Sequence, residues 1–101
     1  MAEEPGYKVK RIMVSAGKRL SYQKHAKRAE IWTVAEGQGL AVIDGRETKL
    51  KAGDTLQVPQ GAAHRMANPG KKTLTFVEVQ LGSYFGEDDI GLTVPAGGET
   101  D

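Results

Sequence analysis

Short β-forming runs separated by turn residues constrain the fold of this chain more than any other feature. The clearest break is Asp44-Gly45, which stands between the runs 40–43 and 46–50, and Asp-Gly favours a two-residue hairpin turn. No window has the apolar periodicity of an amphipathic helix. Together these features predict a small all-β sandwich or barrel. The other expected strands cover residues 7–15, 19–25, 30–35, 55–58, 64–67 and 74–81.

The chain has 101 residues, which predicts one domain with a modest core. We expect a lead-in without structure over residues 1–6, the folded domain over 7–90 and a tail over 91–101. Fourteen Lys and Arg nearly balance thirteen Asp and Glu, and aromatic residues are few, so nucleic-acid binding is not expected. The chain has no cysteine and no membrane-length apolar run, and its first residues do not have the pattern expected of a secretory signal. We therefore expect a cytoplasmic protein without a membrane partner.

Four side chains with metal-binding donors lie in two polar segments of the chain. Gln23 and His25 are two residues apart and share a face if the strand is extended. Glu30 begins the next β-forming run, and His64 lies in the second segment. Two imidazoles, a carboxylate and an amide oxygen suit one divalent transition metal. We expect zinc first, with manganese, cobalt, iron or nickel as alternatives.

The spacing of these residues within glycine-framed segments resembles the two sequence motifs of the cupin superfamily. Gln23 takes the place where the commonest form of the first motif has histidine. The resemblance implies a double-stranded β-helix, also called a jelly-roll barrel, with the metal in its mouth. The first segment is framed by Gly17 and Gly37, and the second contains Gly53, Pro59, Gly61, His64 and Asn68.

Residues 7–90 further resemble the C-terminal cupin domain of type II mannose-6-phosphate isomerases, which is often fused to a GDP-mannose pyrophosphorylase. The pieces that carry this resemblance include Leu20-Ser21, the run 28–30 and the run 86–90. The sequence departs from the family at Ile31, where histidine is usual, and again beyond Ile90. The resemblance implies a metal-dependent isomerase that interconverts mannose 6-phosphate and fructose 6-phosphate through an enediol. It also implies a sugar-phosphate ligand and a homodimer.

Several residues become candidates for the chemistry of such a site. Glu78 is the candidate base, with a buried, hydrogen-bonded carboxylate as the alternative. Gln80 shares its strand face and is a candidate for binding the substrate. Arg28 and Arg65 suit a phosphate group, and Arg65 is also assigned to the catalytic set. Ordinary surface ion pairs are the alternative for both arginines. Trp32 fits a core position and a sugar-stacking wall equally well.

Two other functions remain open because one cupin fold supports many chemistries. The same ligand set would serve an iron or nickel dioxygenase. A non-catalytic cupin that binds a sugar or nucleotide sugar is favoured by the altered tail.

Overall fold

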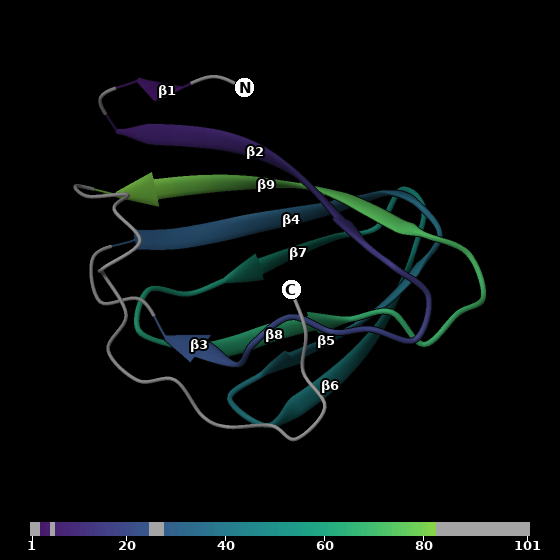
Figure 1. The fold of residues 1–101 in the computed structure, drawn as a ribbon. Helices are drawn as coiled ribbons and strands as arrows, with labels where there is room; N and C mark the ends of the chain where they lie inside the picture. The colour runs from purple at the N-terminus through teal and green to yellow at the C-terminus, as the bar shows by residue number, and fades with distance from the viewer. Residues whose placement is uncertain (1–2, 5, 25–27, 83–101) are drawn as a thin grey trace.

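The computed structural model describes residues 3–4, 6–24 and 28–82, and this part of the chain consists of strands and turns (Figure 1). All strand pairs are antiparallel. The strands are β1 (Glu3–Glu4), β2 (Tyr7–Val14), β3 (Gln23–Lys24), β4 (Arg28–Glu36), β5 (Gln38–Ile43), β6 (Arg46–Lys51), β7 (Thr55–Val58), β8 (Ala63–Ala67) and β9 (Leu74–Gly82).

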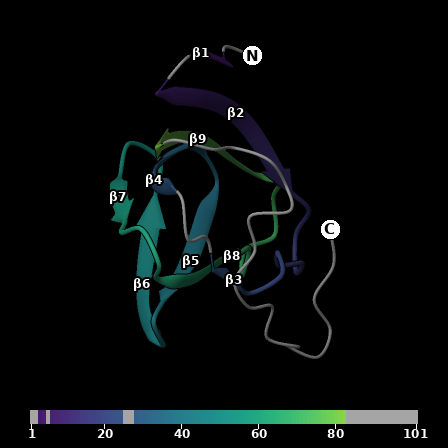
Figure 2. The ribbon, with the colours of Figure 1, turned by 90° about the vertical axis from the view of Figure 1, so that its left-hand side faces the viewer.

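The strands form two sheets that face each other. One sheet has the order β1-β2-β9-β4-β7 and the other has the order β3-β8-β5-β6. A view turned by 90° shows the strands of the two sheets curving around a common interior (Figure 2). Neighbours in each sheet are mostly distant in sequence, as expected for a jelly roll and not for a simple meander. The prediction of an all-β barrel is confirmed.

The Asp44-Gly45 hairpin forms where the sequence predicts it. Both turn residues have positive φ, 49° for Asp44 and 82° for Gly45, as a type I′ turn requires. The Asp44 carboxylate also accepts a hydrogen bond from the backbone N–H of Ala63 at 2.9 Å. The turn therefore links the β5–β6 hairpin to the start of β8.

Two stretches differ from the predicted strands. The strand expected over residues 19–25 is shorter in the structure, because Arg19 makes only an isolated bridge and the regular ladder begins at β3. The predicted lead-in contains β1, because a turn with positive φ at Gly6 folds these residues back onto β2. Both errors concern short pairings that leave little pattern in the sequence.

The apolar core fills one end of the space between the sheets. Five of its fully buried members lie at this end, which we call the closed end. Asn68 seals this end, because its side-chain amide donates to the backbone carbonyls of Val14 and Lys72 at 2.8 Å each. The closed end consists of Val14, Val34, Met66, Leu74 and Phe76.

The predicted boundaries at residues 90 and 91 lie outside the described residues and stay predictions. Within the described ranges there is no helix with the length and hydrophobicity needed to cross a bilayer.

Candidate functional site

The inward faces of β4 and β9 change from apolar to polar along their length. Phe76 pairs with Val34, whereas the next inward pairs are Trp32 with Glu78 and then Glu30 with Gln80. Paired residues lie on the same face of a sheet. The common inward face expected for Glu78 and Gln80 is confirmed, because both are buried.

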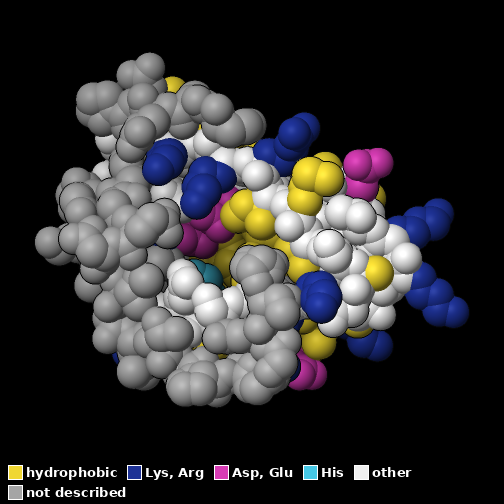
Figure 3. Space-filling model, in the orientation of Figure 1, with side chains coloured by type: hydrophobic (Ala, Val, Ile, Leu, Met, Phe, Trp, Pro, Cys, Tyr) yellow, Lys and Arg dark blue, Asp and Glu magenta, His cyan; other side chains and the backbone are white. Residues whose placement is uncertain are grey.

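Glu30 and Glu78 border a pocket with a volume of about 280 Å³. The space-filling view shows acidic side chains and a histidine in a hollow flanked by basic and apolar side chains (Figure 3). We call this end of the barrel the mouth. Its lining residues are Lys10, Ile12, Leu20, Ser21, Gln23, Arg28, Glu30, His64, Arg65 and Glu78.

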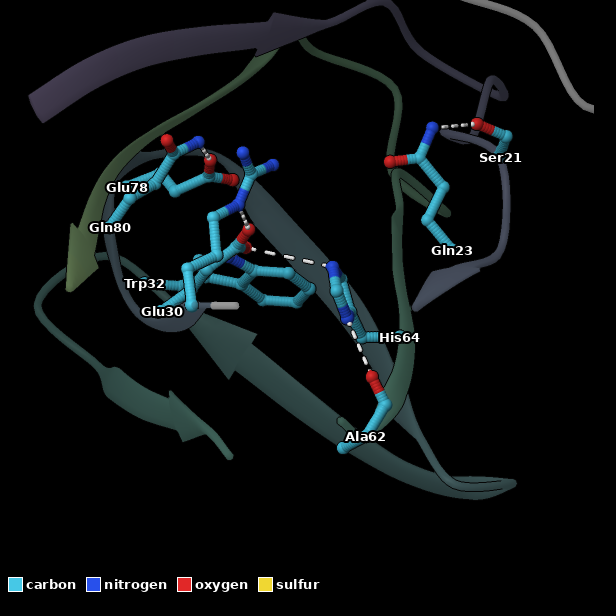
Figure 4. Close-up of polar contacts among 9 residues, drawn as sticks. Ser21, Gln23, Glu30, Trp32, Ala62, His64, Glu78 and Gln80 are labelled. Atoms are coloured by element: carbon cyan, nitrogen blue, oxygen red, sulfur yellow. Dashed lines mark hydrogen bonds and ion pairs between the residues drawn. The ribbon is translucent and has the colours of Figure 1, made fainter. Parts of the chain in front are cut away.

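Glu30 lies at the centre of the polar contacts in the mouth (Figure 4). Its Oε1 accepts a hydrogen bond from Trp32 Nε1 at 2.9 Å, and its Oε2 lies 3.2 Å from Arg28 Nε. The carboxylate is 2% exposed. A buried carboxylate is tolerated when such donors compensate for lost water. Both Trp32 and Arg28 therefore position Glu30 and stabilise its charge.

His64 faces Glu30 from the opposite sheet. Its Nδ1 lies 3.0 Å from the carbonyl oxygen of Ala62. A carbonyl only accepts, so Nδ1 carries the proton that it donates. Its Nε2 is directed toward Glu30 Oε1 at 3.7 Å. Trp32 packs edge-on against the ring, with the centroids 5.6 Å apart. The imidazole is held with Nε2 toward the pocket.

Glu78 is the second carboxyl group of the mouth. Burial and then the charge of Glu30 raise its pKa to about 7, although a hydrogen bond from Gln80 and the charge of Lys10 act in the opposite direction. The amide of Gln80 donates to Glu78, while Gln80 Oε1 has no hydrogen-bond partner in the described structure. Gln80 does not line the pocket, so it acts on the site through Glu78.

The predicted metal ligands are brought together in part. Gln23 pairs with His64 in the β3–β8 register, and its Nε2 donates to Ser21 Oγ at 2.8 Å, which leaves its amide oxygen as an acceptor. His25 lies outside the described residues. Among the described residues no three His, Asp, Glu or Cys side chains cluster as a metal site.

The donor chemistry of the described ligands nevertheless fits a divalent cation. A histidine that donates Nδ1–H to a backbone carbonyl has the orientation usual for a metal ligand that binds through Nε2. The carboxylate of Glu30 faces this nitrogen and is an oxygen donor of the kind that divalent metals accept. Arg28 opposes metal binding, because its positive charge lies beside the same carboxylate.

Arg65 is oriented differently from the other candidates, and its role stays a prediction. It borders the pocket, but it alternates with the inward-facing His64 and Met66 and therefore projects from the other face of β8. Its guanidinium lies over the ring of Tyr22, 5.6 Å from the centroid. Its side chain is thus separated from the contacts around Glu30.

Sequence analysis did not assign a role to Lys10. Lys10 lines the pocket and pairs across the sheet with Glu78. The signal for it was available, because Lys10 has the parity of Ile12 and Val14 on the same strand, and these side chains belong to the core or pack against it. A lysine at an inward-facing position of this strand could therefore have been identified from the sequence as a candidate site residue.

The double-stranded barrel with a polar mouth is that of a cupin. The cupin domain of Cnp3 from Schizosaccharomyces pombe superposes with a TM-score of 0.77 at 16% identity, over 81% of this chain and 60% of that one. The chain belongs to the family described as mannose-6-phosphate isomerase, C-terminal, whose model matches residues 1–93.

Two curated relatives are named mannose-1-phosphate guanylyltransferase. The protein from Sinorhizobium fredii is 44% identical over 84 residues, which is 83% of this chain and 16% of the relative. The protein from Escherichia coli K12 is 45% identical over 84 residues, which is 83% of this chain and 18% of the relative. This chain therefore spans less than a fifth of the length of these enzymes.

These relatives correct the predicted activity. The prediction of a mannose-6-phosphate isomerase is wrong, because relatives that match along the domain are named guanylyltransferases and not isomerases. The family resemblance was identified correctly, but the activity in the name of that family was transferred to a domain that also occurs in guanylyltransferases. The predicted family is confirmed, and the relatives are named as enzymes.

Proposed function

We propose that this cupin domain binds a mannose phosphate and serves the metabolism of mannose 1-phosphate. The observation that supports this function is the pocket of the mouth, which is lined by two carboxyl groups, an imidazole and basic side chains. The names of the relatives support mannose 1-phosphate as the ligand to test first.

The carboxyl groups supply the contacts that a sugar requires. Glu30 and Glu78 accept hydrogen bonds from hydroxyl groups, and each is fixed by a neighbour, Glu30 by Trp32 and Glu78 by Gln80. Preorganised groups lose little conformational entropy when a ligand binds. Trp32 is 1% exposed, packs against Phe76 and His64 and does not line the pocket. It therefore serves as a core residue that orients Glu30 and not as a sugar-stacking surface.

A divalent metal, with zinc tested first, is part of this proposal. Glu30 and His64 would hold it, with Gln23 and His25 as the further predicted ligands. When bound, the ion would act as a Lewis acid toward a sugar oxygen. Without the ion, His64 and Glu30 form the polar contact described above.

Calorimetric titration tests the ligand. We expect saturable binding of mannose 1-phosphate, with weaker binding of mannose or inorganic phosphate alone. Glu30→Gln should weaken the binding of the sugar phosphate at least tenfold. Glu47→Gln is the matched control, because Glu47 is exposed on β6 and does not line the pocket. No binding of mannose 1-phosphate by the folded wild type would refute the proposal.

Metal content after equilibration with zinc and dialysis tests the ion separately. We expect about one zinc per chain in the wild type and a loss of zinc in His64→Gln. Equal zinc content in both proteins would exclude His64 as a ligand. The sugar-phosphate titration would still stand as an independent test.

A further inference from the structure

Lys10 occupies a position in the mouth that complements the phosphate of a sugar phosphate. It lies on β2, and its pairing with Glu78 places it on the inward face, next to a strand that already carries a carboxyl group. The row Trp32–Glu78–Lys10 crosses β4, β9 and β2. Adjacent strands are about 4.8 Å apart, so β2 lies about 10 Å from β4. This separation is comparable to the length of a phosphorylated hexose.

The two other cations of the pocket are less suited to this task. Arg28 is 4% exposed and its Nε is engaged by Glu30. A phosphate that drew Arg28 away from Glu30 would leave this buried carboxylate with one donor fewer. Arg65 projects from the opposite face of its strand, over Tyr22.

We propose that Lys10 binds the phosphate group while Glu30 and His64 contact the sugar. The proposal rests on the proposed function and assigns the two ends of the ligand within the pocket. Lys10 pairs with Glu78 across the sheet and lines the pocket, and its flexible stem lets the ammonium group contact an incoming phosphate from this strand position. Ile12, which lines the same pocket and packs against the core, fixes the strand beneath it.

The test compares two charge-removing variants of neighbouring residues. Lys10→Gln removes the inward cation. Arg11→Gln removes a cation from the adjacent residue, which is exposed and has the opposite parity on β2. Dissociation constants for mannose 1-phosphate and for mannose are measured by calorimetry in both variants and in the wild type. Circular dichroism and thermal unfolding verify that each variant is folded.

We expect Lys10→Gln to weaken the binding of mannose 1-phosphate about tenfold and to leave the binding of mannose within twofold of the wild type. Arg11→Gln should change neither constant by more than twofold. Lys10→Arg should recover most of the affinity for the phosphate. The affinity of the wild type should fall with added salt more steeply than that of Lys10→Gln, because a charge contact is screened.

Two outcomes overturn the assignment. Equal affinity of Lys10→Gln and the wild type for mannose 1-phosphate removes Lys10 from the phosphate site and leaves the proposed function standing. An equal loss for mannose and mannose 1-phosphate shows that Lys10 shapes the pocket without binding phosphate. If the wild type binds no sugar phosphate, the proposed function itself fails.

Discussion

The closed end and the mouth of the barrel are built from the same strands but from opposite kinds of side chains. On β9 the inward residues run from Leu74 and Phe76 at the closed end to Glu78 and Gln80 at the mouth. On β8 Met66 lies at the closed end and His64 at the mouth. On each of these strands, the last apolar core residue and the first polar residue of the mouth are therefore only two positions apart. We expect most of the stability to come from the closed end, because the buried polar groups of the mouth carry a desolvation cost.

The largest expected effect on stability comes from a substitution that removes packing at the closed end. Phe76→Ala should lower the free energy of unfolding by about 3–5 kcal/mol, because it deletes a fully buried ring and leaves a cavity. Denaturant unfolding measures this loss. Val77→Ala, at a half-buried position of opposite parity, is the control and should cost about 1 kcal/mol. Similar losses in the two variants would mean that the closed end does not dominate stability.

A smaller effect is expected at Glu78, and it depends on pH. The carboxyl group titrates near 4.5 in the unfolded chain and near 7 in the folded one. Between these values the folded state retains a proton that the unfolded state has lost. The contribution of Glu78 to the free energy of unfolding should therefore be fully present below pH 4.5 and be lost as the pH rises through 7, which amounts to about 3 kcal/mol.

Glu78→Gln should remove this contribution. Unfolding curves at pH 5 and pH 8 should show that the variant gains stability relative to the wild type at the higher pH. The same pH dependence in both proteins would show that folding does not raise the pKa of Glu78.

The smallest of these effects concerns Trp32, which belongs to both regions. Its ring packs against Phe76 while its N–H donates to Glu30. Trp32→Phe keeps much of the ring but removes the donor, so we expect a loss of about 1–2 kcal/mol in unfolding free energy. We also expect weaker binding of mannose 1-phosphate in calorimetry. Unchanged binding would show that the hydrogen bond from Trp32 to Glu30 is not needed to orient this carboxylate for the ligand.

The sequence was most informative where a local pattern determines geometry. Asp44-Gly45 predicted the hairpin correctly because the turn depends on two residues. Strand parity placed Glu78 and Gln80 together for the same reason. The same rule predicts that His64 and Arg65, as neighbours on one strand, face opposite ways, so only one of them can point into the barrel.

Other features depend on how distant segments meet. The partnership of Arg28 and Trp32 with Glu30 is local, but the approach of His64 requires β8 to lie across the barrel from β4. The roles of Gln23 and His25 as ligands, the metal and the homodimer stay predictions. Activity could not be predicted from the resemblance, because one domain type occurs in proteins with different named functions.

Backbone amide NMR during a titration with mannose 1-phosphate tests the division between the two ends most directly. We expect the largest shift changes at Lys10, Glu30, His64 and Glu78, and little change at the closed end. Changes centred on the closed end, or saturable binding without changes in the mouth, would contradict the account.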